Sequence, residues 1–538
     1  MKAGHGRFTS LSGSGLICFG TLIAMRLSLP YASLLALLFT AVPAEAQLTK
    51  QPKLVVAIVV DQFRYDYLTR FRTGYTGGIE QMLTKGAVFT NAHYNHFPTV
   101  TAVGHSTVLS GATPSVSGII ANDWFDRATA SRVSSVSDSS VELLGATGAA
   151  SSPRRLLVSC LGDEMKIVNA KTKVIGVSLK DRAAILPAGR MANAAYWFDN
   201  KSGNFVTSTY YVPDLPGWVK TYNKSRPGDK FAGSEWRGKK FDAPGETLNA
   251  SLAASPWGNE LVESFAEAAV HQEELGRHGI TDLLTVSFSS NDYVGHAVGP
   301  DDPAVQDMAL RTDILFRKFF LFLDKEVGMQ NVLLVMTADH GVAPVPEVSV
   351  ARKMPGGRLG SGVVEKTIQA ALETRFGKAA WITGSYESMT YLNTDVIAQK
   401  KLDRGEVDAV AAEALMALPH VARVFTREQL LSGNVREDGT GTRVLNGFYP
   451  SRSGDVFVLL EPYWLFGGGT GGTTHGTTLD YDTHVPVIFL GSGIKPGKYY
   501  GAITVNDIAP TLAALLGVEQ PSGTAGRILS EMFTKEVN

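Results

Sequence analysis

The sequence predicts an α/β fold in which a mostly parallel central sheet is flanked by helices on both faces. Its main support is a set of continuous apolar runs rich in β-branched residues, which suit strands buried on both faces of such a sheet. The runs are "KLVVAIVV" (53–60), "KVIGVSL" (173–179), "DLLTVSFS" (282–289) and "NVLLVMT" (331–337). Helical patterns such as "GNELVESFAEAAVHQEE" lie between these runs. Alternation of strand and helix is typical of parallel sheets with crossover helices.

The remaining segments complete this fold or interrupt it. "VPVIFLG" (485–491) predicts a late strand, and "NDIAPTLAALLGV" (506–518) predicts a helix. Residues 186–258 are rich in Gly, Asn, Tyr and Trp with little periodicity, so we expect a loop-rich cap insertion there. Residues 348–465 contain two helical patterns and the strand "GDVFVLLEPYW", which predicts a small inserted α+β subdomain. Both insertions would belong to one catalytic domain over residues 47–538.

Composition narrows the class of protein. The chain has 538 residues, of which 44% are hydrophobic and 19% charged, as in ordinary globular proteins. Its net charge of −1 provides no broad basic field, so we expect no binding to nucleic acid. The two cysteines, Cys18 and Cys160, support neither a disulfide framework nor a thiolate metal site.

The first 46 residues predict a secretory signal peptide. Arg26 precedes an apolar stretch from Leu29 to Val42, and Ala44-Glu45-Ala46 forms a small-x-small cleavage site. Met25 is an alternative start, and an N-terminal membrane anchor is the alternative function of this stretch. Since no later segment is long and apolar enough to span a bilayer, cleavage would release a periplasmic or secreted protein.

Polar residues of the same kinds follow each of the four buried runs. The first run ends at Asp61, the second at Lys180-Asp181-Arg182, the third near Asp292 and His296, and the fourth at Asp339-His340. Because ligands bind at the carboxyl ends of strands in open parallel sheets, these side chains are expected at one edge.

Their spacing suits metal ligation. Asp292 and His296 are four residues apart and would share one face of a helix. Asp339 and His340 can converge only if the strand has ended before them, and Gly341 permits such a bend. His475, in "GGTGGTTHG", is a sixth candidate. Three aspartates and three histidines would form two sites of three ligands each, with open positions as in catalytic metal centres.

A structural role is the alternative for each residue taken alone, since an aspartate after a strand is more often a helix cap. We assign the remaining candidate histidines to structural roles: His93, His96, His105 and His484.

A helix is expected to begin near Ala102 in "FPTVTAVGHSTVLSG", which leaves Thr101 at its mouth. Unpaired N–H groups and the helix dipole favour negative charge at such a position.

Several motifs, in order, resemble the alkaline phosphatase superfamily. They are "VVDQFRYDYL", "FPTVTAVGHSTVLSGATPSVSGIIANDW", "SLKDR", "SSNDYVGH", "TADHG" and "THG…YDTHVPVIFLG". They look most like the exported bacterial alkaline phosphatases with a threonine nucleophile (PafA-like), which are related to the nucleotide pyrophosphatase/phosphodiesterases.

The resemblance implies a role for each matching residue. Thr101 would be the nucleophile and would also contact a metal, while Asn122, Lys180 and Arg182 would hold the phosphoryl oxygens. The two implied zinc sites per chain are Asp61, Asp339 and His340 for one ion, and Asp292, His296 and His475 for the other.

The expected function is therefore hydrolysis of phosphate monoesters, as by an alkaline phosphatase, through a phosphothreonine intermediate. Lys180 and Arg182 favour a dianionic monoester, because a diester carries less charge and needs room for a second organic group. The alternatives are a phosphodiesterase or nucleotide pyrophosphatase at the same two metals, a sulfatase, and a binding module without turnover. Co²⁺ or Mn²⁺ could replace Zn²⁺. We expect a monomer that acts on small-molecule phosphate monoesters.

Overall fold

The computed structural model describes residues 50–534. The predicted signal peptide and its cleavage site therefore lie outside the described residues. Within these residues, no helix combines the length and the apolar character that a membrane crossing requires.

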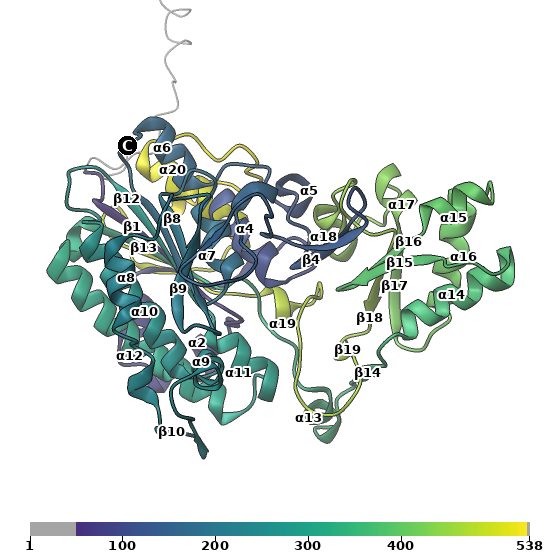
Figure 1. The fold of residues 1–538 in the computed structure, drawn as a ribbon, viewed down its shortest axis with the longest axis horizontal. Coiled ribbons are helices and arrows are strands. Elements are labelled where there is room, and N and C mark those ends of the chain that lie inside the picture. Colours follow the sequence, from purple (N-terminus) through teal and green to yellow (C-terminus); the bar gives the residue numbers. More distant parts are fainter. Residues whose placement is uncertain (1–49, 535–538) are drawn as a thin grey trace, which may run out of the picture. The chain divides into compact units, whose positions relative to one another are not determined.

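A large, mostly parallel sheet forms the centre of the fold, which confirms the predicted fold class (Figure 1). The strand order is β21–β2–β20–β13–β1–β12–β7–β8–β9–β6. Five neighbouring parallel strands make up its middle: β13 (Val332–Thr337), β1 (Leu54–Val60), β12 (Asp282–Phe288), β7 (Val174–Ser178) and β8 (Ala194–Asp199). The flanking strands are β21 (Gly497–Tyr499), β2 (Ala87–Phe89), β20 (Val487–Leu490), β9 (Asn204–Ser208) and β6 (Leu143–Leu144).

β1 lies in the middle of the sheet between β13 and β12, and its seven residues are all buried. It pairs in parallel with β12 and β13, so that Leu54 lies opposite Asp282 on one side and Val332 on the other. This register brings the carboxyl ends of β1, β12 and β13 to the same edge of the sheet.

Helices cover both faces of the sheet (Figure 1). On one face, α7 (Asp181–Ala188) packs on β7 and β12 and against α4 (Thr101–Ser110), which in turn packs against α6 (Leu161–Val168) and α20 (Ile508–Leu516). On the other face, α10 (Pro256–Gln272) packs on the same two strands and against α12 (Pro303–Glu326), beside α3 (Gly78–Lys85) and α11 (Ser290–Val298).

The segment from 186 to 258 differs from its sequence-based expectation. β8 and β9 extend the central sheet, where the sequence suggested only a loop-rich cap. These strands, AAYWFD and NFVTS, are short and show no clear alternation of apolar and polar residues, and long-range packing such as the stacked rings of Phe205 and Phe265 stabilises them. The rest of the segment holds α8 (Gly217–Lys224), α9 (Glu246–Ala253) and the hairpin of β10 (Glu235–Trp236) and β11 (Lys239–Lys240).

The region expected to be an inserted subdomain contains a separate antiparallel sheet with its own hydrophobic cluster around Trp381. Its strands, in order, are β15 (Ile382–Tyr386), β16 (Met389–Leu392), β18 (Val456–Leu460) and β17 (Val421–Thr426). Its helices include α14 (Val363–Phe376), α15 (Thr394–Gln399), α16 (Arg404–Met416), α17 (Arg427–Ser432) and α18 (Gly439–Gly447). The boundaries at 348 and 465 stay a prediction.

Candidate active site

Three strand ends meet through Lys180. Asp61 directly follows β1, Lys180 follows β7 by two residues, and Asp292 lies in α11 after β12. The Lys180 ammonium nitrogen lies 2.6 Å from Oδ2 of Asp61 and 2.6 Å from Oδ2 of Asp292. The carboxyl edge of the sheet therefore gathers charged side chains, as their positions after the strands predict.

Two histidines lie beside the carboxylate of Asp292. The helical spacing in α11 brings Nε2 of His296 to 3.1 Å from Oδ1 of Asp292. His475 comes from a loop nearly two hundred residues further along the chain, and its Nε2 lies 3.7 Å from the same oxygen.

Asp339 and His340 converge because β13 ends at Thr337, so that neither is held in strand geometry. Nε2 of His340 lies 3.4 Å from Oδ2 of Asp339 and 3.5 Å from Oδ1 of Asp61. All three side chains are fully buried.

The donor atoms fit divalent metal ions. Each histidine hydrogen-bonds through Nδ1 to a backbone carbonyl: His296 to Thr473, His340 to Gly341 and His475 to Thr99. Since Nδ1 carries the proton in these bonds, Nε2 keeps a free lone pair, as in metal-binding histidines. Oδ1 of Asp61 and Oδ2 of Asp339 are buried without a hydrogen-bond partner, a costly state that a cation would relieve.

Two clusters have ligand atoms close enough together to share an ion: Asp61, Asp339 and His340 in one, and Asp292, His340 and His475 in the other. The first has the composition that the resemblance implies. The second contains His340 where the resemblance implies His296, which lies next to Asp292 but outside this group. The division of the six ligands between two ions stays a prediction.

The carboxylates of the site differ in the direction of their pKa shifts. Burial, and next the neighbouring Asp339, raises the pKa of Asp61 well above its ordinary value. Burial acts in the same direction on Asp292, but Lys180 and His296 outweigh it and hold the pKa of Asp292 well below the ordinary value. Burial also holds the pKa of His475 well below its usual range, which favours the neutral imidazole that binds metals.

Thr101 is the first residue of α4 and is nearly fully buried. Its Oγ1 lies 3.4 Å from Nε2 of His340. This approach depends on Gly104, because a Cβ there would lie 2.0 Å from the carbonyl oxygen of Asp339. Oδ1 of Asn122 accepts a hydrogen bond of 2.9 Å from the N–H of Ala102, so the expected substrate-binding asparagine also lies at the start of α4.

Lys180 and Arg182, expected as a cationic pair, have different surroundings. Burial would lower the pKa of Lys180, but Asp292 and Asp61 outweigh it and raise it above the ordinary value. Among the described residues, the guanidinium of Arg182 makes one ion pair, a long contact of 3.8 Å to Asp181, and its buried Nε has no hydrogen-bond partner. Arg182 therefore retains donors for an anion, whereas two of the three ammonium hydrogens of Lys180 face carboxylates.

Sequence reasoning missed two residues that support the proposed ligands. His105, which we assigned a structural role, hydrogen-bonds through Nδ1 to the carbonyl oxygen of Thr101 at 2.9 Å and through Nε2 to Oγ of Ser287 at 2.8 Å, and its Nδ1 also lies 3.2 Å from Oδ2 of Asp339. Gln62 donates from Nε2 to Oδ1 of Asp292 at 2.6 Å. The available signals were the helical spacing of four between Thr101 and His105, and the position of Gln62 directly after Asp61.

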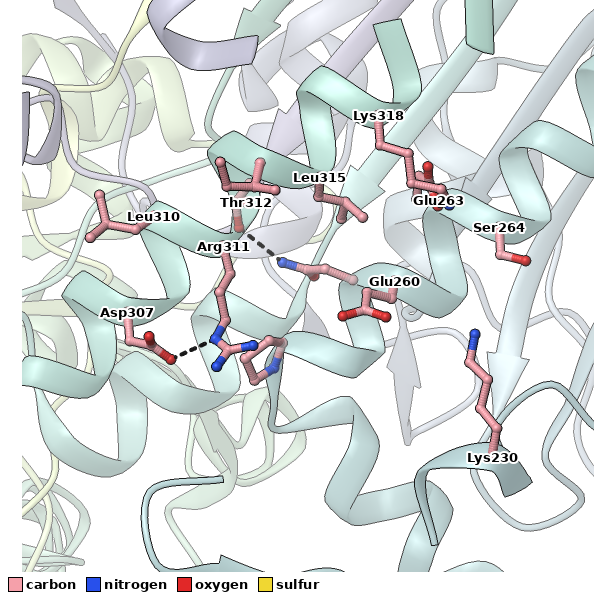
Figure 2. A pocket seen from close by; sticks show the side chains of 13 residues that line it. Lys230, Glu260, Glu263, Ser264, Asp307, Leu310, Arg311, Thr312, Leu315 and Lys318 are labelled. Carbon is pink, nitrogen blue, oxygen red and sulfur yellow. Dashed lines mark hydrogen bonds and ion pairs between the residues drawn. The ribbon is translucent and has the colours of Figure 1, made fainter. Parts of the chain in front are cut away.

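A separate cavity of about 580 Å³ lies between α10 and α12 and contains none of the predicted site residues. Figure 2 shows the charged side chains that line it, among them Glu263 and Lys318. Asn259 in its wall accepts a hydrogen bond of 3.2 Å from the N–H of Ser290, the first residue of α11. This wall thus helps to position the helix that carries Asp292 and His296.

The family model described as type I phosphodiesterase / nucleotide pyrophosphatase matches residues 55–483. The chain belongs to this family. All six proposed metal ligands and Thr101 fall within the matched range of this phosphodiesterase and pyrophosphatase family.

Individual proteins and a solved structure are similar to nearly the whole chain. A protein of Myroides odoratus named "Calcium-transporting ATPase" is 36% identical over 91% of this chain and 96% of its own length. Alkaline phosphatase PafA of Elizabethkingia meningoseptica is 36% identical over 90% of this chain and 95% of its own length. The crystal structure of a PafA mutant, in which a threonine, an asparagine, a lysine and an arginine are substituted, matches with a TM-score of 0.85. That match has 34% identity and covers 90% of this chain and all of the other.

Proposed function

We propose that the protein is a zinc-dependent alkaline phosphatase that hydrolyses phosphate monoesters, with Thr101 as its nucleophile. The observation that carries this proposal is the Thr101 hydroxyl, 3.4 Å from Nε2 of His340 at the first turn of α4. Similarity to PafA, which is named an alkaline phosphatase, supports the same activity. The four residue types substituted in the PafA mutant are those of Thr101, Asn122, Lys180 and Arg182.

Two zinc ions are part of the proposal. One would be held by Asp61, Asp339 and His340, and the other by Asp292, His296 and His475. Bound zinc would stabilise negative charge on the substrate and lower the pKa of a coordinated hydroxyl. The unpartnered oxygens of Asp61 and Asp339 support the first of these sites.

The chain's own residues carry out the transfer. Thr101 gives up its proton to solvent and its Oγ1 bonds to phosphorus, while the bond from phosphorus to the ester oxygen breaks and that oxygen takes a proton from water, so that no net proton is gained or lost. Water then attacks the phosphothreonine, and inorganic phosphate and the threonine hydroxyl are released. The dipole of α4 and the Asn122 amide stabilise the negative oxygens throughout.

Lys180 and Arg182 explain a preference for monoesters over diesters. The third ammonium hydrogen of Lys180 and the free donors of Arg182 would bind the two non-bridging charges of a monoester. Charge-assisted hydrogen bonds are worth about 1.5–3 kcal/mol each. At about 1.4 kcal/mol per tenfold in rate, the loss of both would cost on the order of 10²–10⁴.

The alternative is a phosphodiesterase or nucleotide pyrophosphatase that uses the same residues, as the name of the family model indicates. The deciding experiment is kcat/KM of zinc-loaded protein for an aryl phosphate monoester and for the matching diester. A preference of several orders of magnitude for the monoester supports the phosphatase. A preference for the diester would instead indicate a phosphodiesterase or nucleotide pyrophosphatase. Phosphate binding without turnover would indicate a binding module.

The expected setting of this activity is outside the cytoplasm. We propose that the signal peptide directs the protein to the periplasm or the medium, where a monomeric phosphatase releases phosphate from small organic monoesters. Cell fractionation with N-terminal sequencing of the mature protein tests export and cleavage after Ala46.

A further inference from the structure

A glycine-rich loop (residues 467–473) leads from β19 (Trp464–Phe466) towards the proposed metal ligand His475. Its glycines at 467, 469, 471 and 472 have positive φ angles, from 70° to 125°. A Cβ added to Gly469 or Gly471 would meet no heavy atom within 4 Å beyond its chain neighbours, so these positions face open space. Glycine also loses more backbone freedom on folding than any other residue. The position of this loop therefore depends on the hydrogen bonds that hold it.

The end of the loop is linked to both histidines of one proposed zinc site, His296 and His475. The N–H of Thr473 donates to the carbonyl oxygen of His296 at 2.9 Å, and Nδ1 of His296 donates to the carbonyl oxygen of Thr473 at 2.8 Å. His475 follows two residues later, and its ring centre lies 5.0 Å from that of His296. A displacement of Thr473 would therefore move both imidazoles.

Arg358 holds the loop directly before Thr473. It lies in β14 (Gly357–Leu359), which pairs in parallel with β19 (Figure 1). Nη2 of Arg358 donates to the carbonyl oxygen of Gly471 at 3.1 Å and to that of Gly472 at 2.8 Å. A guanidinium suits this arrangement, because its donors point in fixed directions and it cannot lose its charge.

Glu347 fixes the orientation of this guanidinium. Nε of Arg358 donates to Oε1 of Glu347 at 2.8 Å, and Nη2 donates to Oε2 at 2.9 Å, which makes a bidentate pair. The hydrogen bonds from Arg358 lower the pKa of Glu347 to about 2, so the pair stays charged at neutral and alkaline pH. The side chain of Arg358 is only 14% exposed, which limits competition from water.

Beyond His475 the chain is held by different residues. The N–H and Oγ1 of Thr477 donate to Oδ2 of Asp482 at 2.8 Å and 2.7 Å. His475 thus lies between two points that hydrogen bonds hold in place. Arg358 supplies bonds at the earlier point, and it comes from the region that the sequence predicts as an insertion.

We propose that Arg358 is a positioning residue, which holds the glycine-rich loop so that His296 and His475 keep the separation needed to bind one metal ion. The inference rests on the proposed function, since it takes both histidines as ligands of the same zinc. It gives the inserted region a part in forming the metal centre through one side chain.

Two substitutions and a control test this role. Arg358→Ala removes the bonds to both carbonyl oxygens, whereas Arg358→Lys keeps a charged donor that can reach one of them. Arg352→Ala is the matched control, because Arg352 lies in the same segment but pairs with Asp301. The readouts are zinc content per chain, the Kd of zinc from competition with a chelating dye, and the visible absorption of the cobalt-loaded protein. Thermal unfolding of the metal-free variants checks their fold.

For Arg358→Ala we expect one of the two zinc ions to bind about ten- to a hundredfold more weakly, the typical effect of losing a group that orients a metal ligand. The other ion should keep its affinity, and the cobalt absorption should change for one site only. Arg358→Lys should weaken zinc binding less than Arg358→Ala. Wild-type zinc affinity in the folded Arg358 variants would overturn the inference, as would equal weakening in Arg352→Ala.

The same measurements separate this inference from the proposed function. A wild type that binds two zinc ions but hydrolyses no phosphate monoester would refute the proposed function alone. The zinc titrations of the Arg358 variants would still decide whether Arg358 positions the two histidines.

Discussion

The ammonium nitrogen of Lys180 lies 2.6 Å from Oδ2 of Asp61, between the end of β7 and the end of β1. The same nitrogen lies 2.6 Å from Oδ2 of Asp292, so one cation connects carboxylates that we propose as ligands of different zinc ions. In the proposed mechanism Lys180 would have two functions, neutralising buried charge and offering its remaining hydrogen to a substrate oxygen. Arg182 would have only the second function, which makes it the better probe of substrate preference.

Replacement of Arg182 by Ala should lower kcat/KM for an aryl phosphate monoester by about ten- to a hundredfold, through loss of a charge-assisted hydrogen bond. The rate for the matching diester should change much less, because a diester has one negative charge. The ratio of the two rates is the measurement, with Lys171→Ala, an exposed side chain in the turn before β7, as the control. An equal loss for both esters would mean that Arg182 does not discriminate between them.

Removal of the hydroxyl in Thr101→Ala should reduce turnover by on the order of a thousandfold or more, with zinc content close to that of the wild type. Thr101→Ser should keep measurable activity, because it retains the oxygen. Acid quenching during turnover and phosphopeptide analysis should detect phosphothreonine at Thr101 in the wild type only. Thr107→Ser, in the same helix but bonded within it, is the control. Full activity in Thr101→Ala would exclude Thr101 as nucleophile.

Chelation should abolish turnover and lower the unfolding temperature. Without a bound ion, the buried oxygens of Asp61 and Asp339 have neither a hydrogen-bond partner nor a cation, which destabilises the folded state. An ion present at about 1,000 times its Kd stabilises the folded state by about 4 kcal/mol. Calorimetric unfolding with and without chelator, and again after addition of zinc or cobalt, measures this. An unfolding temperature that is insensitive to both ions would contradict tight metal binding.

The stability of the protein should fall at alkaline pH partly because of Glu263. Burial raises the pKa of Glu263 to about 8 from 4.5, even though Lys318 lies 2.8 Å away and acts in the opposite direction. Because the pKa of Glu263 is higher in the folded than in the unfolded state, its protonated form stabilises the fold fully at a pH below the unfolded-state pKa of 4.5. This stabilisation is lost as the pH rises through the folded-state pKa of about 8. Glu263→Gln imitates the protonated form, so its unfolding temperature should match the wild type at pH about 5 and exceed it at pH about 9.

The control for this measurement is Glu267→Gln, one helical turn away and less buried. A wild type and a Glu263→Gln variant that lose stability equally between the two pH values would show that Glu263 does not gain a proton on folding.

Much of the site could be predicted because its residues follow recognisable strands. Asp61, Lys180 and Asp339 come at the ends of apolar runs whose length and composition are local properties of the chain. The spacing of Asp292 and His296 similarly predicted a shared helical face, and α11 provides it. In contrast, His105 looked like an isolated histidine, because its neighbour Asp339 is more than two hundred residues away in sequence.

The sequence by itself determined the fold class, the order of the buried strands and the sheet edge where the charged residues collect, since continuous hydrophobicity and helical periodicity are set by neighbouring residues. Only the tertiary structure decided that β8 and β9 join the central sheet. It also brought His475 beside Asp292 and placed Lys180 between two carboxylates. These relationships depend on how distant segments pack, and packing is a property of the whole chain that no local pattern contains.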